Sequence, residues 1–268
     1  MGYSKGIVYF IDILGSKNRG FDESLKINNI FRDELNKVQE RHRPTSVGRR
    51  YVTSFSDCAY IIYAIKDEYN TDETFCKYIY TSLYNTASTV AYFVSNGFLC
   101  RGGISCGDLY FEPDRNIIFG PAINEAYLLE QQAKMPRLIV SDELAKILVE
   151  YDTSIKLKNE MAALLNGEII LKDTIDGWYF LNYLNYLIGV GSVGLGTRSF
   201  TFNNYYEQVK ANSINALYTQ NNHDIIAKHK WHLNYLERMK QYNDSLHEMN
   251  ENDLVNMVLR NNTGQNGA

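Results

Sequence analysis

The sequence lacks the features that mark several common classes of protein. Its four cysteines form no Cys-x-x-Cys pair and lie among apolar residues, as reduced and buried thiols of a cytosolic protein do. No segment approaches the roughly 18 to 20 apolar residues of a membrane span. The first residues also lack the charged and then apolar layout of a signal peptide. We therefore expect a soluble, cytoplasmic protein with no membrane partner.

Positive charge is not in excess either. The 268 residues include 27 Lys and Arg against 31 Asp and Glu, for a formal net charge of −4 at pH 7. A general nucleic-acid binder needs a basic surface to neutralise phosphates, so no nucleic-acid partner is expected. Hydrophobic residues make up 45% of the chain, which is enough for one large domain or for a domain with an extension.

Segments typical of strands and helices alternate along most of the chain. Residues 7–14 form a continuous apolar run, typical of a central strand covered on both faces. Residues 22–40 repeat apolar positions at helical spacing, residues 41–50 are a basic connection, and residues 50–65 form a hairpin with Ser-Asp at its bend. The alternation predicts one α/β domain. Further helices are expected over 71–96, 121–133 and 142–151, and further strands over 98–111, 117–120, 137–141, 168–173 and 178–184.

We place this domain at residues 1–185 and expect a Gly-rich linker and a helical C-terminal extension over residues 186–268. Four apolar residues recur at helical spacing in the extension and give it an apolar face, which would pack on the core or on a second subunit. These residues are Trp231, Tyr235, Met239 and Tyr242.

Two motifs in this part of the chain predict no ligand. Residues 189–194, "GVGSVG", fit the Gly-x-Gly-x-x-Gly pattern of dinucleotide sites, but no helix opens after them, so a linker is expected. His229 and His232 share one helix face, but no further ligand stands near them in the sequence. A metal site needs more than these two nitrogens.

Two aspartates are unusual for their positions. Asp12 lies inside a buried strand, where an unpaired carboxylate is costly, so a metal or another cation should compensate it. Asp57 lies at the bend of the hairpin. If the two strands are neighbours, both carboxylates reach one point at the sheet edge, and together with a backbone carbonyl they suit Mg²⁺ or Mn²⁺. The structural alternatives, an Asp capping a strand end and an ordinary turn Asp, stay open.

An ordered set of motifs around these residues resembles the class III nucleotidyl cyclases. The resemblance covers roughly residues 5–183 and implies a ferredoxin-like palm, an α/β (α+β) fold, that dimerises and shares each active site between two chains. The motifs are "YFIDILG", "SFSDCAYIIY", "RGGISCGDLYF", "IFGPAINEAYLLE" and "RLIVSDEL".

The resemblance also implies roles for individual residues. Asp12, Asp57 and the carbonyl of Ile13 match the ligands of two Mg²⁺ or Mn²⁺ ions per active site. Asn124 matches an asparagine that comes from the partner subunit and orients the ribose, and Lys172 matches, more loosely, a lysine that binds the triphosphate. The implied reaction is attack of the ribose 3′-hydroxyl on the α-phosphorus, with pyrophosphate leaving.

Three positions depart from the family pattern. Thr53 stands four residues before Asp57, where purine cyclases carry a base-reading lysine or its equivalent. Ile117 stands where they carry a polar base reader, seven residues before Asn124. Leu128 replaces the arginine that stabilises charge on the phosphorus in the transition state. With Thr53 and Ile117 at the two base-reading positions, both purine readers are absent.

The residues around the base position favour a one-ring base. Tyr51 and Thr53 share a strand face, since side chains alternate with period two, and a tyrosine there would shrink the pocket. In this respect the chain is similar to the pyrimidine cyclases of the bacterial anti-phage system Pycsar, which make cyclic UMP or cyclic CMP for a separate effector. Thr53 and Arg101 provide donors, which favours the O4 of uracil and therefore UTP as substrate.

Several alternatives remain open on the sequence alone. They are a cytidylate cyclase acting on CTP, an adenylate or guanylate cyclase with unusual base contacts, and a catalytically inert cyclase fold that serves as a binding or dimerisation module. Tyr51 could equally be an ordinary strand aromatic. Arg101, the candidate substitute for the missing arginine at Leu128, could equally form a structural ion pair.

Overall fold

The computed structural model describes residues 2–15, 19–40, 47–155, 168–188, 193–195 and 198–248. Its first six long elements follow the order strand, helix, strand, strand, helix, strand. The four strands lie in the sheet order β2-β3-β1-β4, and each neighbouring pair is antiparallel. This is the ferredoxin-like arrangement, which confirms the expected fold class. The elements are β1 (Ser4–Ile13), α1 (Phe21–Glu40), β2 (Gly48–Phe55), β3 (Cys58–Ile65), α2 (Asp72–Ser95) and β4 (Cys100–Glu112).

The next part of the chain extends the sheet beyond β4. Strand β6 runs parallel to β4, and β8 and then β7 continue to the far edge, while β5 folds back on the end of β4 as a hairpin. These elements are β5 (Ile117–Phe119), α3 (Pro121–Gln132), β6 (Leu138–Val140), α4 (Asp142–Ile155), β7 (Ile170–Lys172) and β8 (Tyr179–Leu181). Short 3₁₀ turns lie at Asp67–Tyr69, Pro113–Arg115 and Tyr183–Tyr186.

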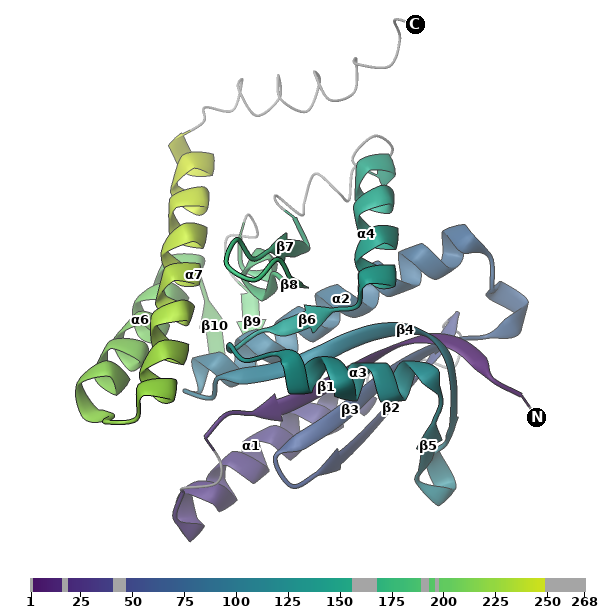
Figure 1. Cartoon of the computed structure of the whole chain (residues 1–268), viewed down its shortest axis with the longest axis horizontal. Helices are drawn as coiled ribbons and strands as arrows, with labels where there is room; N and C mark the ends of the chain where they lie inside the picture. Colours follow the sequence, from purple (N-terminus) through teal and green to yellow (C-terminus); the bar gives the residue numbers. More distant parts are fainter. Residues whose placement is uncertain are drawn as a thin grey trace, which may run out of the picture.

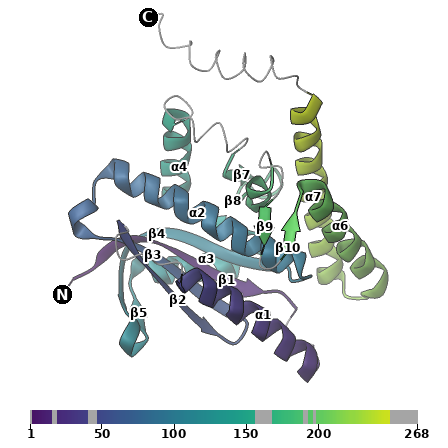
Figure 2. The same ribbon diagram turned by 180° about the vertical axis from the view of Figure 1, so that it is seen from behind.

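Strand β1 shows why the sheet is covered on both faces. Its odd-numbered residues from Ile7 to Ile13 belong to the main core with α1 and α2, whereas Val8 and Phe10 belong to a second cluster under α3. Alternation with period two sends successive side chains to opposite faces. Figure 1 shows α3 in front of the sheet, and Figure 2, from behind, shows α1 and α2 on the other face. Asp12 continues the Val8 and Phe10 series and therefore belongs to the α3 face.

The C-terminal extension packs on the same molecule. Helices α6 (Phe202–Thr219) and α7 (His223–Glu248) lie against each other, and their apolar residues join the main core. Tyr235 and Met239 are buried there, and Trp231 and Tyr242 pack at its border. This confirms the apolar face expected from the sequence and decides that the core of the chain itself covers it. The boundary drawn after residue 185 stays a prediction.

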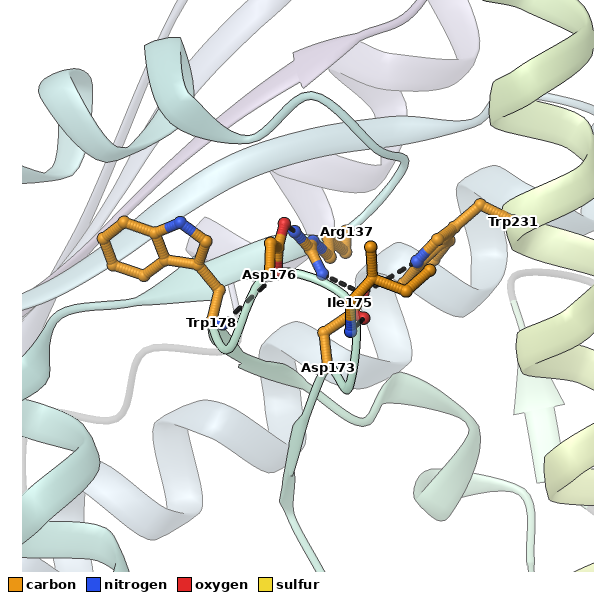
Figure 3. Close-up of polar contacts among 6 residues, drawn as sticks. All are labelled: Arg137, Asp173, Ile175, Asp176, Trp178 and Trp231. Carbon is orange, nitrogen blue, oxygen red and sulfur yellow. Dashed lines mark hydrogen bonds and ion pairs between the residues drawn. The ribbon is translucent and has the colours of Figure 1, made fainter.

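A buried arginine network joins α7 to the sheet (Figure 3). Arg137, just before β6, donates to Asp173 and to Asp176 in the β7–β8 turn. The indole of Trp231 on α7 donates to the same Asp173 oxygen at 2.8 Å, and its ring lies 5.4 Å from the Arg137 guanidinium. The guanidinium also lies 5.8 Å from the ring centre of Phe180 on β8. A buried cation shared by two carboxylates and two rings is a specific attachment.

The structure corrects two expectations about connections. Residues 48–50 belong to strand β2 and not to the basic connection, and Arg50 lies over the ring of Tyr63. Residues 193–195 form β9 (Val193–Leu195), which pairs with β10 (Arg198–Phe200), so that part of the expected linker is a two-stranded sheet. Pairing with β10 satisfies the backbone groups of a segment whose glycines alone favoured a linker. The rest of "GVGSVG", residues 189–192, lies outside the described residues.

Within the described parts of the chain, none of the helices has the length and apolar character needed to cross a bilayer.

Candidate active site

The two aspartates lie at the same end of neighbouring strands. Asp12 is the penultimate residue of β1 and pairs with Cys58, the first residue of β3. Asp57 precedes Cys58 in the two-residue turn of the β2–β3 hairpin, and its carbonyl accepts a hydrogen bond of 3.0 Å from the Ile13 N–H. The hairpin turn and the end of β1 are thus joined directly. The end of β1, which carries Asp12, and the hairpin turn, which carries Asp57, therefore lie side by side at one end of these strands.

The thiol of Cys58 reports the electrostatics of this edge. Burial, and then the charges of Asp12 and Asp57, raise the pKa of Cys58 to about 11. The thiol therefore keeps its proton at neutral pH, and it donates to the Phe55 carbonyl at 3.0 Å. The charges of Asp12 and Asp57 thus both act on one thiol, which agrees with the proximity of the two strand ends.

Arg101 lies directly across from Asp12 on β4. Its Nε donates to Asp12 Oδ2 at 3.2 Å and lies 2.7 Å from the Oε1 of Glu130, on the last turn of α3. The Glu130 carboxyl is 3% exposed, and its burial is the main cause that raises its pKa. Arg101 therefore forms the ion pair that the sequence left open as an alternative, and it compensates two carboxylates at once.

Helix α3 lies on β4 in a repeating register. Arg101, Gly103 and Ser105, two residues apart on β4, meet Glu130, Ala126 and Ala122, four residues apart on α3. The rises match, since two strand residues span about 6.8 Å and four helical residues about 6.0 Å. A Cβ at Gly103 would collide with the Ala126 carbonyl, and so only glycine lets the helix approach this closely. The contacts are Arg101 with Glu130, Gly103 with Ala126, and Ser105 Oγ donating to the Ala122 carbonyl.

This packing decides which side of α3 faces outward. Gly120 precedes the helix with a φ of 135°, and a Cβ there would lie 2.8 Å from the Asp108 carbonyl. Pro121 then begins the helix, and the Asn124 N–H donates to the Gly120 carbonyl at 3.1 Å. Asn124 and Leu128 are exposed, one turn apart on the outer side. Asn124 therefore does not lie on the buried side of α3, where Glu130 shares Arg101 with Asp12 of the same chain.

Tyr51 and Thr53 meet a residue that the sequence analysis missed. The Tyr51 hydroxyl donates to Asn116 Oδ1 at 2.8 Å, and the Thr53 hydroxyl donates to the same atom at 3.0 Å. Asn116 directly precedes Ile117, the first residue of β5. The hairpin of β4 and β5 thus brings the positions expected to contact a base to one place. A Pro-Asp-Arg-Asn turn was the only local signal for Asn116, and it does not say which strand the turn meets.

Lys172 lies apart from these residues. It is exposed near the end of β7, with its ammonium 5.3 Å from the ring centre of Tyr179, and β4, β6 and β8 separate it from β1.

Glu130 is the other site residue that sequence analysis missed. It shares the buried stripe of α3 with Ala122, Ala126 and Leu129, and a charged residue on an apolar stripe was its signal.

The donor chemistry at the Asp12 edge fits a hard divalent cation. Carboxylate and carbonyl oxygens are the ligands that Mg²⁺ and Mn²⁺ prefer. In the described ranges, no three or more His, Cys, Asp and Glu side chains gather in a way that could hold a metal. A metal here would therefore depend on the two aspartates, the Ile13 carbonyl and the ligand itself.

Neither a family model nor a curated protein matches the sequence. The fold is similar to the catalytic core of a rhodopsin-guanylyl cyclase with converted specificity in complex with ATPαS, with 14% identity over 68% of this chain and 96% of that chain and a TM-score of 0.44. It is also similar to a bacterial light-regulated adenylyl cyclase, with 16% identity, 68% and 92% coverage and a TM-score of 0.40. A further structure of such a bacterial cyclase has 19% identity, 55% and 46% coverage and a TM-score of 0.37.

Proposed function

We propose that this protein is a nucleotidyl cyclase that converts UTP to 3′,5′-cyclic UMP and pyrophosphate. The observation that carries the proposal is the hydrogen bond from the Ile13 N–H to the Asp57 carbonyl, which holds Asp57 beside the end of β1 that carries Asp12. These are the residues that the class III resemblance assigns to metal binding. Their strands belong to a ferredoxin-like sheet, the fold which that resemblance implies.

The chain's own residues account for positioning the reactants. Asp12, Asp57 and the Ile13 carbonyl would hold Mg²⁺ or Mn²⁺, two ions per site by the resemblance. When bound, such ions lower the pKa of a hydroxyl and stabilise charge on phosphate oxygens. Tyr51 and Thr53, farther along β2, would mark the position of the base, and the ribose 3′-hydroxyl would then face the α-phosphorus in line with the leaving pyrophosphate.

A homodimer would complete this site. Asn124 lies on the exposed side of α3. In a homodimer, the Asn124 of one chain would contact the ribose of the substrate bound to the other chain. Large exposed apolar residues lie around Asn124, which favours burial against a second copy. They are Leu128 at 57%, Phe119 at 48% and Tyr127 at 45% exposed. Lys172, distant from Asp12 in its own chain, would meet the triphosphate by the same exchange.

The biological setting of the proposal follows from the resemblance to Pycsar cyclases. The protein would act in the bacterial cytoplasm, where cyclic UMP would signal phage infection to a separate effector. Its mixed charge and net charge of −4 agree with a small-molecule substrate and not with nucleic acid.

One observation favours a second candidate function, an inert cyclase fold that serves as a dimerisation module. Leu128 stands where the resemblance needs an arginine, and Arg101 is engaged with Asp12 and Glu130. In that case neither residue would stabilise a transition state.

The test is to incubate the protein with each of the four ribonucleoside triphosphates and Mn²⁺ and to identify the products by mass. We expect cyclic UMP from the wild type and none from Asp57→Asn. Asp67→Asn, an exposed aspartate beyond the opposite end of β3, is the matched control and should keep full activity. Cyclic AMP or cyclic GMP as the main product would refute the pyrimidine proposal, and no product from any triphosphate would favour the inert module.

A further inference from the structure

Asn116 is held at the junction of β2 with the β4–β5 hairpin. Its Oδ1 lies within hydrogen-bond distance of two hydroxyls on β2, those of Tyr51 and Thr53. The residue has a left-handed φ of 52°, which asparagine tolerates better than most residues. Its own N–H donates to the Pro113 carbonyl at 3.0 Å. The side chain is thus anchored at two points on one strand, β2, while the residue stays exposed.

The anchor itself is rigid. Tyr51 is 8% exposed, and its ring stacks on Phe111 of β4, with centres 5.8 Å apart and planes 16° apart. A buried, stacked tyrosine keeps its hydroxyl in one place, and Thr53 adds a second fixed donor two residues along the strand. The amide of Asn116 therefore has one orientation with respect to the sheet.

The hydrogen-bonding pattern decides what this amide offers. Both hydroxyl hydrogens are directed at Oδ1, so the two Nδ2 hydrogens are the donors that the cluster presents. A base that meets them needs an acceptor. Uracil has a carbonyl, O4, where cytosine has an amino group, and two facing donors repel each other.

The cluster also lies at a suitable distance from the metal edge. Thr53 and Tyr51 are two and four residues from Phe55, which pairs with Cys58 beside Asp57. At about 3.4 Å per strand residue these steps correspond to roughly 7 and 14 Å. A ribose and a base extending from a phosphate at the aspartates would span such a distance.

We propose that Asn116 is the residue that selects uracil over cytosine, by donating from Nδ2 to the O4 carbonyl of uracil. Tyr51 and Thr53 are the residues that position Asn116. This inference rests on the proposed function and names the base-selecting residue that the sequence analysis did not contain. The hydroxyls of Tyr51 and Thr53 then act through Asn116, in place of the direct base contact expected for Thr53.

The test compares kcat/KM for UTP and CTP in the wild type and in Asn116→Asp. Aspartate has the same shape and tolerates the same φ, but it presents an acceptor oxygen in place of the amide NH2 group. We expect the UTP-to-CTP ratio to fall at least tenfold, with CTP gaining in absolute terms. Asn116→Gly, which keeps the left-handed backbone but has no amide, should bring the ratio close to one. Asn234→Asp, an exposed position on α7, carries the same charge change and should leave the ratio unaltered.

Binding gives a second readout that does not need turnover. Titration calorimetry of UTP and CTP on the Asp57→Asn background should show the same change of preference when Asn116→Asp is added. An unchanged ratio in both measurements, with pyrimidine turnover intact in the wild type, overturns the inference and leaves the proposed function standing. A wild type that prefers CTP also overturns it, because the opposite orientation of the amide would then face the base. A wild type that neither binds nor cyclises pyrimidines overturns both.

Discussion

The Nε of Arg101 lies 3.2 Å from Asp12 Oδ2 and 2.7 Å from Glu130 Oε1, so one guanidinium connects the end of β1 with the last turn of α3. Asp12 belongs to the proposed metal edge, and α3 carries Asn124 on its outer side. Within one chain, the ion pair therefore fixes α3, which carries Asn124, against the strand end that carries Asp12. In a homodimer, the Asn124 of one chain would serve the Asp12 site of the other. The ion pair also explains how a carboxylate near the end of a buried strand is compensated in the protein alone.

Removing the cation should destabilise the fold. Arg101→Met leaves the buried carboxylate of Glu130 without its partner, and we expect the free energy of unfolding in urea to fall by about 3 kcal/mol. Adding Glu130→Gln should recover part of this loss, since the unpaired charge is then gone. The control Arg115→Met breaks an exposed pair with Glu112 and should cost less than about 1 kcal/mol. Equal losses for the two arginine variants would contradict the assignment.

Metal binding can be measured without catalysis. We expect Mn²⁺ to raise the Tm of the wild type as its concentration rises, because a ligand of the folded state stabilises it by about 2.7 kcal/mol at one hundred times its Kd. Asp57→Asn should respond much less, and a chelator should reverse the effect. Asp67→Asn should respond as the wild type does. The same rise in Tm for both variants would place the metal elsewhere.

Restoring the arginine of the family pattern should increase turnover. Leu128 is 57% exposed on α3, so Leu128→Arg should fold with a stability within about 0.5 kcal/mol of the wild type. We expect kcat to rise roughly tenfold or more, because a cation at the phosphorus is a large part of transition-state stabilisation. Leu128→Gln, which has no charge, should not raise kcat. An unchanged kcat in Leu128→Arg would indicate that another cation already fills this role.

The attachment of α7 should depend on one indole N–H. Trp231→Phe keeps the ring but loses the bond to Asp173, and we expect a loss of about 2 kcal/mol, typical of a hydrogen bond to a buried charge. Trp178→Phe is the matched control, because the indole of Trp178 points away from Arg137 in Figure 3 and only its backbone N–H bonds to Asp176. Urea unfolding of the two variants measures the difference. A similar, small loss in both would contradict the role of the network.

Acid should weaken the same attachment through His232. The ring is buried between Tyr183, 2.6 Å from Nε2, and Ser213, 3.2 Å from Nδ1, and burial lowers its pKa from 6.5 to about 3. Between these values the unfolded chain binds the extra proton, so stability is complete above pH 6.5 and falls as the pH drops toward 3, by at most about 1.4 kcal/mol per pH unit.

Urea unfolding at pH 7, 6 and 5 would show this slope. His232→Asn should be less stable at pH 7 but should lose less stability on acidification than the wild type does. His229, whose pKa burial also lowers, leaves part of the slope in place. His223→Asn, exposed at the start of α7, should behave as the wild type, and an equal reduction of the slope in that variant would contradict the assignment.

What the sequence determined by itself is local. A continuous apolar run made β1 recognisable, and helical spacing marked α1. Asp12 was conspicuous because it breaks a local rule, as a charge in an apolar strand. Asp57 obeys the turn rule and gained its interest from the resemblance. Such rules concern neighbours within a few residues, and the structure agrees with them.

Only the tertiary structure decided which groups meet. The bond from Arg101 to Asp12 spans 89 positions of the chain, and that from Tyr51 to Asn116 spans 65. Periodicity tells which face a side chain occupies but not which element covers that face, since many segments of similar pattern could do so. The register of α3 on β4, set by Gly103 and Ser105, selected Glu130 as the partner of Arg101. In the same way, the packing of α7 on the core decided that His232 is a buried structural residue.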